Sequence, residues 1–207
     1  DFFGGDVAAF QQEGGNLFDG MRLVLDQQFA RLSPLEQEIL VWLAVEREPV
    51  TVPMLRSNVV QPIATAALLE ALQALQNRSL LEKHENGLTL QNVIIEYMTE
   101  YLVEQVCREI VDEKTKVALG QPVNQSSDPL ATFSFLNRFA LLKAQSKEYT
   151  RQSQERLILQ PVAAQLQRRW EQRALAVKVQ QMLNELREKE IRHGYAAGNL
   201  LNLLIHL

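Results

Sequence analysis

The sequence predicts a mainly α-helical protein with one short β-hairpin, built as two helical units. Three observations support this prediction. Helix-capping signals and apolar residues at helical spacing recur along most of the 207 residues. The pair Asn86-Gly87 stands between two short runs of strand-forming residues, at 80–90. A stretch with Gly, Pro and Ser at 120–132 has the composition of a linker, and we place a domain boundary there.

The first predicted helix begins after Ser33, which has the position of an N-cap. Pro34 follows at the first helical position, and Glu36 completes a capping box. Apolar residues at helical spacing then predict one buried stripe: Leu35, Ile39, Leu40, Trp42 and Leu43.

Two further helices and a hairpin are predicted next. A short second helix has Thr51 as its cap, and a third covers 63–77 with a buried face of Leu68, Leu72 and Leu75. The hairpin turn is predicted at Asn86-Gly87, a pair favoured where both turn residues have positive φ. Another amphipathic helix begins near Val93. Three helices followed by strand, turn and strand are the order of a winged helix-turn-helix, with the hairpin as the wing.

The second unit, 133–207, is predicted to be a helical-bundle domain. Pro161 removes a backbone donor, so we expect the helix over 153–170 to kink or break there. The last helix, in YAAGNLLNLLIHL, is apolar on nearly every side and is predicted to be buried.

The composition, with 46% hydrophobic and 22% charged residues, is that of a soluble globular protein. No apolar stretch approaches the ~20 residues that span a bilayer, and no signal-peptide pattern opens the chain. One cysteine, Cys107, excludes an internal disulfide and fits a reducing compartment. We therefore expect a cytoplasmic protein without a membrane segment. Because the chain begins at Asp1 and ends in an apolar run, we also expect both ends to continue into a longer protein.

Charge is distributed unevenly along the chain. Residues 33–107 hold four Lys and Arg against ten Glu, a net −6, whereas 143–193 hold eleven Lys and Arg against six Glu, a net +5. The third helix has no Lys or Arg between Arg56 and Arg78, and its one charge is Glu70, so phosphate would be repelled. No aromatic residues alternate with the cations of the basic part, which favours a solvated surface there. We expect no nucleic-acid binding, although a DNA-binding winged-helix regulator and a scaffold or interaction module remain alternatives.

The run LSPLEQEILVWLAVEREPVTVPML, with LLEALQALQNRSLLEKHENGLTLQNVIIEYMTEYLVEQV after it, resembles the winged-helix subdomain of NB-ARC-type STAND ATPases. The resemblance is strongest over 30–110, and to cyanobacterial multidomain proteins that end in WD or pentapeptide repeats. It implies that 1–32 is the tail of a preceding helical subdomain, 33–119 the winged helix, and 133–207 a helical domain leading to repeats. In this family the winged helix binds no DNA. It closes over a nucleotide held by a separate P-loop domain, and its swing on exchange of ADP for ATP activates the protein.

The resemblance also assigns residues. The family's Met-His-Asp motif falls on Leu90, Gln91 and Asn92. In relatives the His contacts the β-phosphate of ADP, which implies that Gln91 and Asn92 contact nucleotide in the full-length protein. Gln91 can donate an amide hydrogen bond but brings no charge, so the ADP lock is expected to be weaker. A helix that starts near Val93 offers free N–H groups to an anion, which fits contact with phosphate. Gln91 and Asn92 could equally be residues that only cap this helix.

No catalytic residue and no metal ligand set is predicted. FFGGDVAAF and QEGGNLF carry glycines without the lysine of a P-loop. His84, His193 and His206 are far apart and lack metal-ligand spacing. We therefore expect a non-catalytic regulatory chain without a cofactor of its own. The resemblance implies ADP or ATP with Mg on a P-loop domain of the full-length protein, which is expected to be an ATPase. That domain and the C-terminal repeats are the implied intramolecular partners, and a homo-oligomer on activation is left open.

Overall fold

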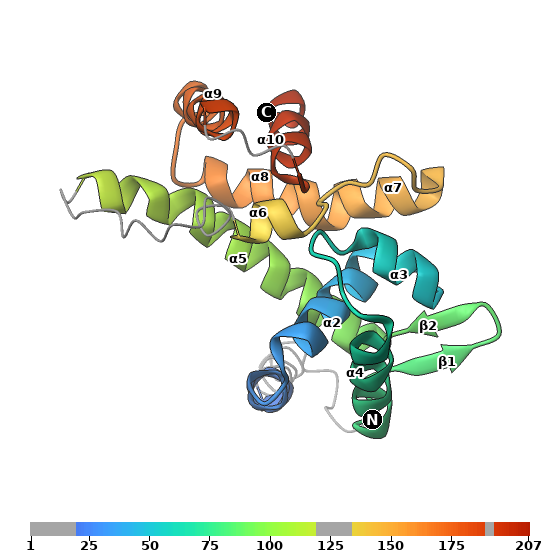
Figure 1. Cartoon of the computed structure of the whole chain (residues 1–207). Helices are drawn as coiled ribbons and strands as arrows, with labels where there is room; N and C mark the ends of the chain where they lie inside the picture. The colour runs from blue at the N-terminus through green and yellow to red at the C-terminus, as the bar shows by residue number, and fades with distance from the viewer. Residues whose placement is uncertain (1–19, 119–133, 189–192) are drawn as a thin grey trace.

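The structure, a computed structural model, describes residues 20–118, 134–188 and 193–207. Within these ranges it is mainly helical, and its sheet is a two-stranded antiparallel hairpin (Figure 1). The predicted fold class is thus confirmed. The glycine-containing segments near the start of the chain and the predicted linker at 120–132 lie outside the described residues.

The first helices begin where their caps predict. Helix α2 spans Pro34–Glu46, with the Glu36 backbone N–H donating to Ser33 Oγ at 3.3 Å and the Ser33 N–H donating to Glu36 Oε2 at 2.6 Å. Helix α3, Val52–Asn58, is capped by Thr51. Helix α4, Thr65–Asn77, buries the three predicted leucines together with Ala71. Capping and helical spacing therefore located all three helices.

The hairpin consists of β1, Glu82–His84, and β2, Gly87–Thr89, with His84 opposite Gly87. Its two turn residues are therefore Glu85 and Asn86, and the predicted Asn86-Gly87 turn is wrong by one residue. Of the predicted pair only Gly87 has a positive φ, 142°. Glycine is needed at position 87 because the backbone there lies against Val50, which exchanges two backbone hydrogen bonds with Leu88, at 2.8 and 2.9 Å. A Cβ on residue 87 would lie 2.5 Å from the Val50 carbonyl oxygen, so this close approach requires glycine.

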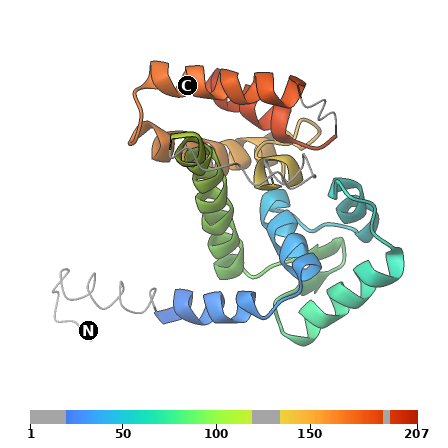
Figure 2. The ribbon, with the colours of Figure 1, turned by 60° about the vertical axis from the view of Figure 1, so that its left-hand side comes forward.

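Helix α5, Asn92–Ala118, runs from the hairpin through the body of the protein (Figures 1 and 2). It packs against α2 on the winged-helix side and against α6 and α8 on the other. A helix over 20–30 lies across α5, where the Phe29 ring meets the Tyr101 ring at 4.7 Å and Asp26 accepts a hydrogen bond from Tyr97. Helix α5 is therefore the element common to both halves.

Residues 134–188 and 193–207 form what we call the helical arm. Its elements are α6, Ser134–Arg138; α7, Glu148–Gln154; the π-helical turn η2, Glu155–Leu159; α8, Gln160–Gln167; α9, Gln172–Glu188; and α10, Ala196–His206. The break considered at Pro161 does not occur; the helix continues through it, with a π turn just before the proline. Helices α7, η2 and α8 are continuous, and the Gln160 N–H reaches back to Glu155 in the widened π turn. The outer layer is made by α9 and α10 (Figure 2).

Helix α10 is only half buried, which corrects the prediction from its apolar sequence. Leu200 and Leu203 face the protein, whereas Leu201 is 51% and Ile205 is 84% exposed. No helix within the described ranges is long and apolar enough to cross a bilayer.

One hydrophobic core runs through the winged helix and the arm. Trp42 on α2 contacts the Phe139 ring at 5.6 Å and the Tyr195 ring at 5.2 Å, both in the arm. The predicted burial of Ile39, Leu40, Trp42 and Leu43 is confirmed, but every residue from Ile39 to Glu46 is buried, so burial is not confined to one stripe. The helix is enclosed because α5 covers one side and the arm another.

Candidate functional site

The junction between the hairpin and α5 carries the residues that the sequence singles out. Leu90 is 2% exposed and anchors the junction in the core. Helix α5 begins at Asn92, and the Gln91 carbonyl accepts hydrogen bonds from the N–H groups of Ile94 and Ile95, both at 2.9 Å. Gln91 therefore holds the N-cap position, and Asn92 is the first helical residue.

The side chains of Gln91 and Asn92 are both exposed. Neither one hydrogen-bonds within the described part of the chain, so the capping function considered for them is not seen there. The first turn of α5 contains no acidic residue. The helix thus presents its N-terminus and two neutral amides to solvent, and both amides can donate to an anion.

A buried polar network joins the winged helix to the arm. We call it the seam network, and its members are Glu46, Asn58, Lys143, Gln154 and Tyr195. At its centre Glu46 is only 2% exposed and Asn58 4%. Asn58 Nδ2 donates to Glu46 Oε1 at 2.6 Å, and Lys143 Nζ donates to the same oxygen and to Asn58 Oδ1, the latter at 3.0 Å. A carboxylate of the winged helix is thus neutralised by a cation of the arm.

Gln154 and Tyr195, the outer members of the seam network, each donate to a backbone carbonyl of the winged helix. Gln154 is fully buried; its Nε2 donates to the Val45 carbonyl at 2.9 Å, and its Oε1 accepts from the Lys143 N–H at 3.0 Å. Tyr195 donates its hydroxyl proton to the Asn58 carbonyl at 2.8 Å. Burial, with a smaller effect of the Glu46 charge, raises the pKa of Tyr195, which keeps the hydroxyl a donor. Buried polar groups that are fully paired fix one geometry.

An exposed ion pair borders the seam network. Glu48 accepts hydrogen bonds from Lys147 Nζ at 2.8 Å and from the Tyr149 hydroxyl at 2.7 Å. The bond from Lys147, more than that from Tyr149, lowers the pKa of Glu48. Glu48 lies just beyond α2, and both partners come from the arm, so this contact extends the same interface to the surface.

Sequence reasoning missed the seam network. Its partners are far apart in the chain, and Glu46 follows an apolar helix at a position where a surface charge is common. The one available signal was a glutamate directly after a fully apolar run, LVWLAV. No group of three His, Cys, Asp or Glu residues that could hold a metal ion occurs within the described residues. Cys107 is buried, and burial raises the pKa of its thiol to about 12.

Comparison with known proteins gives one informative similarity. No protein-family model matches the chain, and no solved structure matches it. An uncharacterized WD repeat-containing protein of the cyanobacterium Nostoc sp. (strain PCC 7120) is 41% identical over 231 aligned positions. The alignment covers all of this chain and 18% of that protein. The chain is therefore similar to less than a fifth of a WD repeat-containing protein.

Proposed function

We propose that this chain is a regulatory, non-catalytic part of a longer cytoplasmic signalling ATPase of the STAND type, with an NB-ARC nucleotide-binding unit and WD repeats. In this proposal the winged helix senses whether a separate P-loop domain holds ADP or ATP with Mg, and the arm passes that state to the repeats. The similarity to a WD repeat-containing protein supports the part of the proposal that concerns the repeats. The nucleotide-binding unit rests on the sequence resemblance over 30–110.

The seam network is the observation that carries the proposal. If the winged helix swings, the arm must follow, since separating the two would leave the buried Glu46 carboxylate without Lys143. The shared aromatic contacts of Trp42 oppose separation in the same way. A movement of the winged helix would therefore also move the arm, as the proposed coupling between nucleotide and repeats requires.

Gln91 and Asn92 are the residues proposed to face the nucleotide. Both are exposed at the start of α5 and free to donate to phosphate oxygens. A neutral hydrogen bond contributes about 0.5–1.5 kcal/mol net, and one from a charged donor up to ~3 kcal/mol. Replacing Gln91 by His should therefore slow ADP release by up to roughly tenfold.

The test is the ADP dissociation rate of the full-length protein, compared for wild type, Gln91→His and Gln91→Ala. Gln73→His is the matched control, because Gln73 is an exposed glutamine on a different helix, α4. We expect slower release for Gln91→His, faster release for Gln91→Ala and no change for the control. Equal rates in all four proteins would remove Gln91 from the nucleotide site. The residues encoded before Asp1 give a second test, since the proposal requires a Walker motif there.

Duplex DNA is not expected to bind. The exposed side of α4 presents Leu69, Glu70 and Gln73, and the first cation before it, Arg56, hydrogen-bonds Thr65 at 3.0 Å. Such a surface offers little to phosphates. A gel shift at physiological salt with sub-micromolar, salt-dependent affinity would instead favour the DNA-binding alternative.

A further inference from the structure

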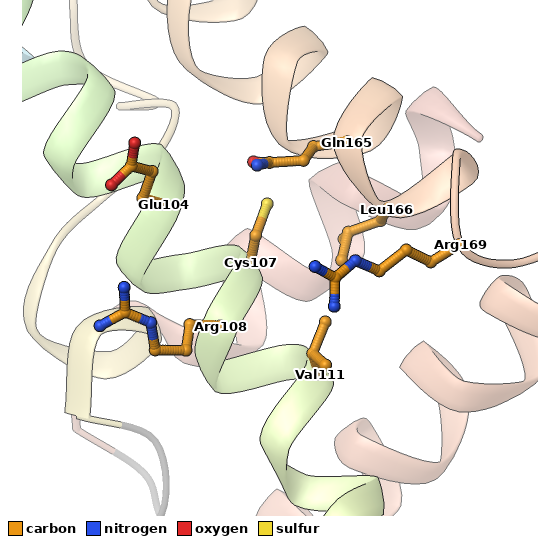
Figure 3. Close-up of a pocket in the computed structure, with 7 residues that line it drawn as sticks. All are labelled: Glu104, Cys107, Arg108, Val111, Gln165, Leu166 and Arg169. Atoms are coloured by element: carbon orange, nitrogen blue, oxygen red, sulfur yellow. The ribbon is translucent and has the colours of Figure 1, made fainter.

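A cleft of about 400 Å³ lies between α5 and α8, three to five turns along α5 from its start (Figure 3). Its walls come from two helices that pack firmly together. Apolar groups of Cys107, Val111 and Leu166 line part of it. The cleft thus lies between α5 and the arm, away from the hairpin–helix junction.

Arg169, just after α8, is the polar residue that projects furthest into this cleft. Figure 3 shows its guanidinium group reaching across toward Cys107 and Val111, with the Gln165 amide above the thiol. Its guanidinium group has no hydrogen bond or ion pair within the described residues; the Arg169 backbone N–H donates to the Leu166 carbonyl. Arg169 is exposed to solvent, so its planar fork of donors at the cleft is accessible to an anion from solution.

Glu104, the acidic residue that lines the cleft, does not pair with Arg169. Glu104 is held by Arg22, whose Nη2 donates to Glu104 Oε1 at 2.5 Å. In Figure 3 it stands on the far side of Cys107 from Arg169. Arg108 adds a second positive charge at the rim, with one long hydrogen bond of 3.5 Å to Gln105. The buried Cys107 thiol is protonated at neutral pH and contributes no negative charge.

We propose that this cleft binds a carboxylate or phosphate group carried on an apolar body, with Arg169 as the anchor. The guanidinium fork matches two oxygens of either anion, and the Gln165 amide can donate a further hydrogen bond. Val111 and Leu166 accommodate the apolar part. Such a ligand would contact both α5 and α8 and would stabilise their packing. This site is separate from the nucleotide site proposed at the start of α5.

The experiment titrates four probes into the isotope-labelled 207-residue chain and follows amide resonances by NMR. Hexanoate and hexyl phosphate carry the two anions on the same apolar body, hexanol is the uncharged counterpart, and inorganic phosphate lacks the apolar part. We expect saturable shifts at Cys107, Val111 and Leu166 in the millimolar range for one or both hexyl anions, as suits so small a ligand. Hexanol and inorganic phosphate should bind at least several-fold more weakly, and the better hexyl anion identifies the preferred group.

Two variants locate the anchor. Arg169→Gln should weaken binding about tenfold, the effect of losing a charged hydrogen-bonding partner. Arg173→Gln removes a nearby exposed cation that does not line the cleft, and it should change the affinity less than twofold. Equal weakening by both variants, equal binding of hexanol, or shifts centred on residues 91–95 would each overturn the proposal. So would the absence of saturable shifts with either hexyl anion.

Discussion

Lys143 and Glu46, 97 positions apart in the chain, form a hydrogen-bonded ion pair in which the carboxylate is almost wholly shielded from water. The lysine comes from the loop between α6 and α7, and the glutamate is the last residue of α2. This pair defines how the arm sits on the winged helix, and it gives the first prediction.

Lys143→Met should destabilise the protein by about 3–5 kcal/mol, because it leaves a buried carboxylate without its cation. Combining it with Glu46→Gln should restore much of the loss, since the remaining amide carries no charge. Urea unfolding measures both. Lys147→Met serves as the control: it breaks the exposed pair with Glu48 and should cost only about 0–1 kcal/mol. Equal losses for the two lysine variants would show that the buried pair has no special role.

Gly87→Ala should destabilise the hairpin by on the order of 2 kcal/mol. The new Cβ would meet the Val50 carbonyl oxygen at 2.5 Å, and the backbone φ of 142° is unfavourable for alanine. Gly198→Ala is the matched substitution on α10, where a Cβ would find nothing within 4 Å. That change should instead stabilise the protein by about 0.4–1 kcal/mol. Thermal unfolding of the two variants should therefore shift in opposite directions.

Glu48 should contribute to the acid sensitivity of the fold. Its pKa is lowered in the folded protein below the ordinary 4.5, mainly by the hydrogen bond from Lys147. Its contribution to stability is therefore complete above pH 4.5 and is lost as the pH falls through the lowered pKa. Glu48→Gln should have a shallower loss of stability in this acidic range than wild type. Glu70→Gln, at an exposed site on α4, should follow the wild-type curve.

Cys107 should be almost inert toward thiol reagents in the folded protein. With its pKa raised to about 12, the thiolate fraction at pH 8 is on the order of a thousandfold below that of a free cysteine. Labelling with iodoacetamide, followed by mass spectrometry, measures the rate. The same protein in urea should label rapidly, and rapid labelling without urea would contradict the buried position.

The sequence predicted those parts of the fold that depend on local interactions. The capping box of Ser33 and Glu36 placed α2, and the leucine spacing placed the buried face of α4. Predictions failed where distant segments meet. The turn was misplaced because Gly87 is required by Val50 and not by the turn itself. The burial of α2 on nearly every side could not be predicted, because it depends on arm residues about 100 positions away.

The candidate site divides in the same way. The position of Gln91 and Asn92 at the start of a helix was predictable from the hairpin and the apolar pattern after it. The seam network and the position of Arg169 at the cleft were not, because nothing in the local sequence distinguishes these residues from other polar residues. A glutamate and a lysine that meet across an interface can be recognised only once the two chain segments are placed together.

The π turn at Glu155–Leu159 makes the continuous helix of the arm unequally sensitive to deletions along its length. Such a turn holds one residue more than a regular helix of the same length. Deleting a residue there would restore regular α-helical bonding and leave the following helix nearly in phase, whereas deleting one from the regular helix α7 would rotate everything after it by about 100°. In that second case Val162, Ala163 and Leu166, now buried, would turn away from the core. The widened turn thus takes up its extra residue locally and keeps α8 in phase with α5.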